Sequence, residues 1–145
     1  MRVRETIDIA APVERVFAWF DDLDNAEVLV PNLVAITKVE PLDNGGRRVV
    51  YRVETRSDVI DASSEHLEYD PPRRTVTRGL QSGVSTTATR EFESVDGGTR
   101  VSASVEWDIP IRYVARLVTA PLRGPLRRSL RAGLAAAKGA FEERA

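Results

Sequence analysis

The chain has 145 residues, of which 42% are hydrophobic and 30% charged, and its formal net charge at pH 7 is -1. We expect one globular domain over residues 1–145, because this length and composition suit a single filled core. No apolar stretch approaches the roughly 20 residues of a membrane-spanning helix. The absence of cysteine and the single histidine argue against a disulfide framework, a thiol nucleophile and a metal site, and no cofactor is expected.

The first ten residues hold no apolar core of signal-peptide length, which favours a cytoplasmic protein.

The first expected elements are a strand and a short helix. The β-branched segment VRETIDI, residues 3–9, favours the strand. Pro12 then suits the first turn of a helix, where its missing N–H costs nothing. The apolar residues after it share one helical face: Val13, Val16, Phe17 and Phe20. The segment AEVLVPNL, residues 26–33, can hold a second short helix before Pro31 ends it.

From Leu33 to Trp107 the chain consists of β-branched runs separated by the turn signals DNGG, RSD, DPPRR, QSG and DGGT. This pattern predicts a meander of six antiparallel strands. An antiparallel sheet with one solvated face must cover its other face. The only later element with enough apolar surface is the C-terminal segment, so we expect the sheet to curl around it.

After Pro110 the apolar residues follow a helical period: Leu122, Leu126, Leu130, Leu134, Ala137 and Phe141. Pro121 and Pro125 interrupt the start of this segment. Because a proline removes a helix hydrogen bond, we expect residues 111–124 to form a bent or separate piece, a candidate lid over a cavity.

The segment IDIAAPVERVF, residues 7–17, resembles the start of the START-like helix-grip (SRPBCC) superfamily, which includes the polyketide cyclase/dehydrase and lipid transport group and the Bet v 1-like proteins. Three later segments agree with it: LEYDPPRRTVTRGLQSG (67–83), GGTRVSASVEW (97–107) and LRGPLRRSLRAGLAAAKGAFE (122–142). The resemblance implies an α+β fold, a seven-stranded curled antiparallel sheet around a long C-terminal helix, with two short helices after the first strand. It also implies a cavity that holds an apolar or amphipathic small molecule.

Hairpin geometry predicts which side chains face that cavity. A two-residue loop at Pro71–Pro72 would pair Leu67 with Val76 and Glu65 with Arg78. A two-residue loop at Gly97–Gly98 would similarly pair residue 92 with 103, 90 with 105 and 88 with 107.

If Leu67, Val76, Phe92 and Trp107 face the helix, the two-residue period of a strand puts a polar stripe on the same face. The ligand site predicted in this way comprises Tyr51, Asp61, Ser63, Glu65, Arg78, Arg90, Phe92, Val101, Trp107, Leu126 and Leu130.

Two interpretations of the polar stripe are open. In the first, Arg78 or Arg90 donates to a ligand oxygen, Glu65 or Asp61 acts as general acid or base, and the hydroxyl of Tyr51 lines the pocket. In the second, the acid and arginine at 65 and 78 form an exposed cross-strand ion pair, or a β-bulge turns them outward.

Two aromatic side chains are expected near the surface. His66 has the opposite parity to Glu65 and should face solvent, unless the register slips by one residue. Trp19 lies off the apolar stripe of the first helix and should be partly exposed or contact a partner.

Residues 109–145 hold 8 basic residues against 2 acidic ones, whereas residues 1–108 hold 13 against 20. Arg123, Arg127 and Arg131 each follow a leucine of the helical stripe, and we call these three the basic ridge. It could contact an anionic membrane, an acidic ligand headgroup or the acidic body of the same molecule. Nucleic acid is not expected, because the ridge has no interleaved aromatic residues.

The first functional hypothesis is therefore a protein that carries or sequesters an apolar or amphipathic small molecule, such as a lipid or polyketide. The second is a polyketide cyclase or dehydratase with Tyr51, Glu65, Arg78 and Arg90 in its active site. The third is a module that binds a protein partner or a membrane surface through the basic ridge. No group of residues demands catalysis, so the carrier is preferred.

Overall fold

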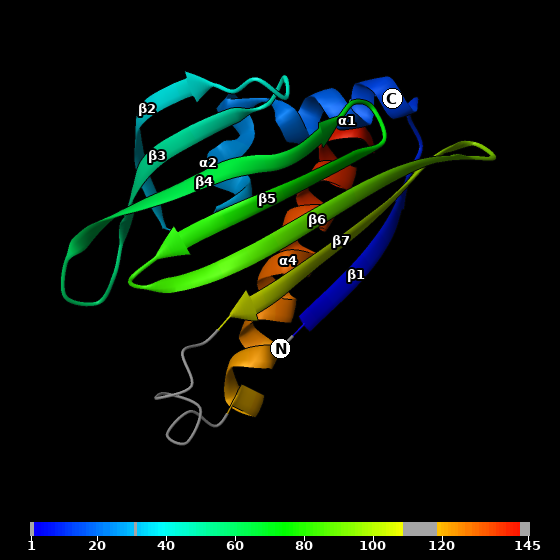
Figure 1. Cartoon of the computed structure of the whole chain (residues 1–145). Coiled ribbons are helices and arrows are strands. Elements are labelled where there is room, and N and C mark those ends of the chain that lie inside the picture. Colours follow the sequence, from blue (N-terminus) through cyan, green and yellow to red (C-terminus); the bar gives the residue numbers. More distant parts are fainter. Residues whose placement is uncertain (1, 31, 109–118, 143–145) are drawn as a thin grey trace.

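The computed structural model describes residues 2–30, 32–108 and 119–142 (Figure 1). In chain order the elements are β1 (Arg2–Ile9), α1 (Val13–Asp21), the 3-10 helix η1 (Leu23–Asn25), α2 (Ala26–Leu29), β2 (Leu33–Pro41), β3 (Arg47–Glu54), β4 (Val59–Asp70), β5 (Arg74–Gln81), β6 (Val84–Val95), β7 (Gly98–Asp108) and α4 (Thr119–Glu142).

The strands form one antiparallel sheet with the order β1-β7-β6-β5-β4-β3-β2. Strands β2 to β7 follow one another across the sheet in chain order, and β1 pairs with β7 at the edge opposite β2. Figure 1 shows α4 crossing one face of the curled sheet, with α1 and α2 near one end of that face. The predicted α+β arrangement of a seven-stranded sheet and a C-terminal helix is confirmed.

The predicted stripe on α1 is confirmed as part of the core. Val16, Phe17 and Phe20 are buried, and Phe92 of β6 packs against both phenylalanines. The ring centroid of Phe92 lies 5.1 Å from that of Phe17 and 5.6 Å from that of Phe20, in edge-to-face geometry. Trp19 is partly exposed, as predicted, and its ring packs against Phe20.

The junction between β1 and α1 is tied to the start of β7. The buried hydroxyl of Thr99 donates a hydrogen bond of 2.8 Å to the carbonyl oxygen of Ala11. At Gly98 a Cβ atom would lie 2.0 Å from the carbonyl oxygen of Ile9, so no larger residue fits there without moving the backbone. The small residue lets β7 approach the β1–α1 junction closely.

The apolar stripe of α4 is also confirmed where its side chains are described. Leu134 and Ala137 are buried, and Leu130 and Phe141 pack partly against the core. The side chains of Leu122 and Leu126 lie outside the described residues.

The prediction of a separate piece is wrong for residues 119–124. Helix α4 begins at Thr119 and contains both Pro121 and Pro125. Pro121 stands in the first turn, where its missing N–H has no helical partner to lose, and Pro125 removes one hydrogen bond near the helix start. The rest of the proposed lid, up to residue 118, lies outside the described residues.

Two arginines of the basic ridge contact the body of the same molecule. Nη2 of Arg131 lies 3.0 Å from Oε1 of Glu5 on β1, and Nε of Arg127 lies 3.5 Å from the same oxygen. These ion pairs agree with the intramolecular use of the ridge. The side chain of Arg123 is not among those described, and contact with a membrane stays a prediction.

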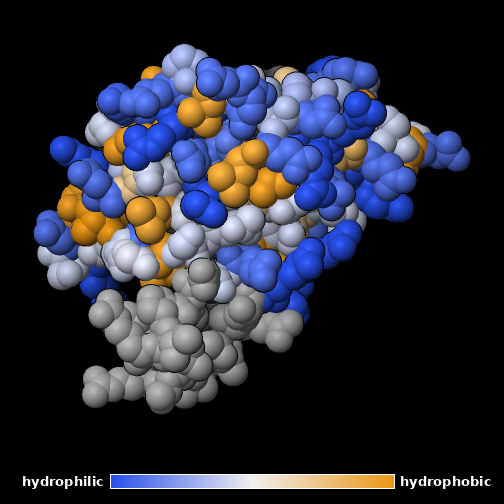
Figure 2. Space-filling model, in the orientation of Figure 1, coloured by the Kyte–Doolittle hydropathy of each residue, from blue (hydrophilic) through white to orange (hydrophobic). Residues whose placement is uncertain are grey.

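The β4–β5 hairpin departs from its predicted register. Glu65 lies opposite Arg78 as predicted, but a bulge places Glu68, and not Leu67, opposite Val76. Leu67 is therefore on the outer side of the sheet and 44% exposed. Figure 2 shows hydrophobic residues on this side of the molecule in small groups among hydrophilic ones.

The β6–β7 hairpin has the predicted faces but different partners. Its two-residue turn is Asp96–Gly97, so Phe92 lies opposite Val101 and Arg90 lies opposite Ala103. Each partner differs from the prediction by two residues, which is one full period of a strand. The predicted inward direction of Phe92 and Arg90 is thus preserved.

Candidate ligand-binding site

A cavity of about 500 Å³ lies between the inner face of the sheet, α2 and α4. A smaller pocket of about 190 Å³ lies beneath the end of α1, and both spaces are bordered by Phe20, Tyr51 and Arg90. We call these two adjoining pockets the two ends of the recess.

The end along α4 is mainly apolar. Leu130 and Leu134 line it from the helix, and Val105 and Trp107 line it from β7. Gly133 is buried between the two leucines, and a Cβ atom there would lie 3.4 Å from the side chain of Leu29 on α2. The two helices therefore approach closely beside this end of the cavity.

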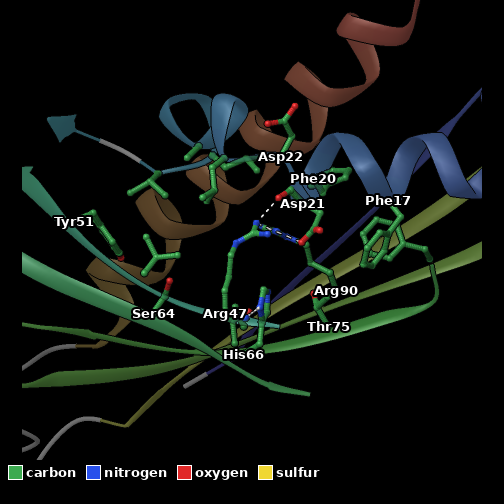
Figure 3. Close-up of a pocket in the computed structure, with 18 residues that line it drawn as sticks. Phe17, Phe20, Asp21, Asp22, Arg47, Tyr51, Ser64, His66, Thr75 and Arg90 are labelled. Carbon is green, nitrogen blue, oxygen red and sulfur yellow. Dashed lines mark hydrogen bonds and ion pairs between the residues drawn. The ribbon is translucent and has the colours of Figure 1, made fainter. Parts of the chain in front are cut away.

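The smaller pocket holds most of the ionisable side chains of the recess among apolar ones, and Asp21 at the end of α1 organises them (Figure 3). We call it the polar pocket. The hydroxyl of Tyr69 donates to Oδ2 of Asp21 over 2.7 Å. Nη2 of Arg47 lies 3.4 Å from Oδ1 of the same carboxylate and also donates to the carbonyl oxygen of Asp21. Burial, together with this hydrogen bond to Asp21, raises the pKa of Tyr69 to about 12. Both carboxylate oxygens of Asp21 are therefore engaged.

His66 lies in the wall of this polar pocket. The backbone N–H of Arg47 donates to Nδ1 of His66 over 3.0 Å, which requires the imidazole to be neutral with its proton on Nε2. Gly46 leaves space for the ring, because a Cβ atom there would lie 2.5 Å from Cβ of His66. Burial first, and then the charge of Arg47, lowers the pKa of His66 below the unperturbed 6.5, against an opposing effect of Asp21.

The lowered pKa of His66 predicts a pH-dependent stability. Below about pH 6.5 the unfolded chain takes up a proton on this imidazole more readily than the folded chain does, so the free energy of unfolding should decrease as the pH falls. We expect the chemical-denaturation midpoint to fall more between pH 7.5 and 5.5 for the native protein than for His66→Gln. Parallel pH profiles for the two proteins would contradict this.

Arg90 extends from β6 between the two ends of the recess. Its guanidinium carbon lies 5.2 Å from the ring centroid of Phe20, a cation–π contact. Burial lowers the pKa of Arg90, while the charge of Asp21 raises it, and an arginine stays protonated in proteins. A permanent positive charge therefore borders the cavity.

Small hydroxyl groups complete the polar wall. Ser64 on β4 and Thr77 on β5 line both ends of the recess, and Thr75 lines the smaller pocket. Burial raises the pKa of Tyr51, which keeps its phenol protonated and able to donate. The wall thus offers mainly hydrogen-bond donors and neutral hydroxyls.

Several predicted site residues border the recess, namely Tyr51, Arg90, Phe92, Trp107 and Leu130. Val101 is fully buried in the core beside Phe92 and does not line the recess. The side chain of Leu126 falls outside the described residues.

The prediction is wrong for the polar residues of β4 and β5, which are Asp61, Ser63, Glu65 and Arg78. The inner residues of β4 alternate with them: Ala62 is buried, and Ser64 and His66 line the recess. On β5, Thr75 and Thr77 face inward, so Arg78 is turned outward and exposed. The predicted inner and outer faces of both strands were exchanged because Val76 and Leu67 were assumed to face the helix.

The prediction that His66 faces solvent is wrong, because His66 shares the inner face of β4 with Ala62 and Ser64. Arg47 and Asp21 are further site residues that the sequence reasoning missed. For His66 the available signal was the alternation of Ala62, Ser64 and His66 with the acids Asp61 and Glu65 on the other face of the strand. Nothing in the sequence connects Asp21 with Arg47, because these residues come from different elements and meet only in the folded chain.

Among the described residues, no group of three or more His, Asp or Glu side chains could hold a metal ion. No helix in the described part of the chain has the length and apolar character needed to cross a membrane.

The fold and the recess define a helix-grip protein with an internal cavity that has an apolar and a polar end. Residues 1–142 match the sequence model of the family described as polyketide cyclase/dehydrase and lipid transport. The chain therefore belongs to this family. A search of curated proteins finds no sequence match.

Solved structures with similar folds include a protein from Thermus thermophilus, which is 17% identical over 100% of this chain and 99% of its own, with a TM-score of 0.77. Zhui, an aromatase/cyclase from a Streptomyces species, is 20% identical over 99% of this chain and 94% of its own, with a TM-score of 0.73. The di-domain ARO/CYC protein StfQ from the steffimycin biosynthetic pathway is 17% identical over 99% of this chain and 51% of its own, with a TM-score of 0.77. At these identities the similarity concerns the fold.

Proposed function

We propose that the protein binds an apolar or amphipathic small molecule, such as a lipid or polyketide, in its central recess and carries or sequesters it. The observation that carries this proposal is the cavity of about 500 Å³ between the sheet and α4. Its volume falls in the range of roughly 300–1,000 Å³ that is usual for small-molecule sites, and the larger part of its lining is apolar, with hydroxyl and amide side chains between the apolar ones.

The test is to fill the cavity from one strand. Ala88 on β6 lines both ends of the recess, whereas its neighbour Thr87 points to the other face of the sheet. We expect the neutral dye Nile red to bind the native protein saturably at one site. Ala88→Phe should weaken that binding at least tenfold, and the matched control Thr87→Phe should leave it unchanged. Absence of saturable binding to the native protein would contradict the proposal.

A cyclase or dehydratase is the second candidate, and His66 is the observation that favours it. A neutral imidazole whose Nδ1 is held by a backbone N–H can exchange a proton through Nε2 with a bound molecule. Glu65, the acid first considered for this role, is on the outer face and is no longer a candidate. With a polyketide substrate, an enzyme should lose turnover in His66→Gln while retaining binding, whereas a carrier has no turnover to lose.

A further inference from the structure

We infer that the cavity's ligand is an amphipathic monoanion, an ionised carboxylic acid whose carboxylate lies beside Arg90 and His66 while its apolar part extends along α4. This inference rests on the proposed function and names the chemical class of ligand that the same recess accepts.

The first argument is the guanidinium of Arg90. Within the described part of the chain it takes part in no hydrogen bond or ion pair, and its aromatic contact is with Phe20. An entirely apolar occupant would remove water from this charge and leave it without a partner, which is unfavourable. An occupant with an anionic oxygen at this point supplies the missing partner.

The second argument is the charge balance of the polar pocket. The carboxylate of Asp21 is already engaged by Arg47 and Tyr69. Asp22 also borders the pocket, but it is exposed and accepts a backbone N–H of η1 over 2.9 Å. Arg47 is thus paired with Asp21, and Asp22 lies in solvent, so Arg90 is the charged side chain of the pocket wall that contacts no counter-charge among the described residues. One unpaired positive charge matches a carboxylate better than a phosphate monoester, which carries about -1.5 to -2 at pH 7.

The third argument is a second donor. Because Nδ1 of His66 accepts the N–H of Arg47, the proton of the neutral ring is on Nε2, which has no hydrogen bond with another described residue. The imidazole therefore offers a donor, and no acceptor, to the occupant of the pocket. A carboxylate accepts several hydrogen bonds, so it can receive those of Arg90 and His66 together.

The remainder of the ligand is expected to be apolar. The larger end of the recess is bordered by Leu130, Leu134, Val105 and Trp107, and no acidic residue lines it. A molecule with one charged end and one apolar end therefore matches both parts of the recess.

The inference is tested with pairs of ligands that differ only in the charged group. Dodecanoate is compared with dodecanol, and 2-naphthoate with 2-naphthalenemethanol, by isothermal titration calorimetry at pH 7.5. We expect each acid to bind at least about tenfold more tightly than its alcohol, which corresponds to about 1.4 kcal/mol. The comparison of the two acids distinguishes a straight-chain lipid acid from a fused-ring acid as the better occupant.

Variants of Arg90 connect this preference with the proposed contact. Arg90→Gln should abolish the preference for acid over alcohol, Arg90→Lys should retain most of it, and Arg78→Gln on the outer face should leave it unchanged. Thermal unfolding and Nile red binding show whether each variant keeps its fold and its cavity. Should Arg90→Gln fail to fold, the comparison of acid with alcohol in the native protein still decides the inference.

Three results would overturn the inference in distinguishable ways. With Nile red still bound, equal affinities for acids and alcohols would refute the monoanion. A preference for acids that survives Arg90→Gln would refute the placement of the carboxylate beside Arg90. Either result would leave the proposed function standing. If the native protein binds neither Nile red nor any of the four ligands, both proposals fail.

Discussion

Replacing Phe92 with alanine is expected to lower the free energy of unfolding by about 3–5 kcal/mol, the usual cost of truncating a buried phenylalanine. The ring is 5% exposed and stands at the centre of the aromatic cluster, in edge-to-face contact with Phe17 and Phe20. Its removal leaves a cavity where α1 meets β6, because the backbone hydrogen bonds of the sheet limit how far the surroundings can collapse.

Urea denaturation followed by circular dichroism measures this loss. Val39→Ala on β2 is the control, since that side chain is 46% exposed and its truncation should change the free energy of unfolding by less than about 0.5 kcal/mol. A cost below about 1 kcal/mol for Phe92→Ala would mean that the aromatic cluster is not the core of this end of the fold.

Truncation of two leucines on α4 should separate the role of the helix in stability from its role at the cavity. Leu134 is 3% exposed and belongs to the buried core, so Leu134→Ala should lower the free energy of unfolding by about 2–5 kcal/mol. Leu130 lies one turn earlier and is only partly buried at the cavity wall. Leu130→Ala should cost less stability, because the side chain has fewer packing neighbours to lose.

The same two variants should differ in the opposite direction in Nile red binding. Both leucines border the recess, but Leu130 is less buried and offers more of its side chain to an occupant, so Leu130→Ala should change the dissociation constant more than Leu134→Ala does. Equal losses of stability in the two variants, or a larger loss for Leu130→Ala, would mean that α4 is packed on the sheet differently from the arrangement described here.

The helices were predictable because their stabilising contacts follow one period along one segment. The buried face of α1 follows from the spacing of Val16, Phe17 and Phe20 alone. The buried face of α4 follows in the same way and is confirmed at Leu134 and Ala137. On β6 and β7 the prediction of the inner face survived an error in the turn, because the partners moved by two residues and the direction of a side chain repeats every two. Arg90 was identified for this reason.

The sequence by itself determined the order of the elements, the antiparallel meander and the helix that covers it, since each follows from local periodicity and turn residues. Only the tertiary structure decided the polar half of the site. The prediction used Leu67 and Val76 as inward-facing references, but both face outward, so the residues at the same alternation on β4 and β5 were assigned to the wrong face. Asp21, Arg47 and His66 meet because α1, β3 and β4 converge at one end of the sheet, and an interaction between residues so far apart in sequence depends on the packing of whole elements, which no local pattern encodes.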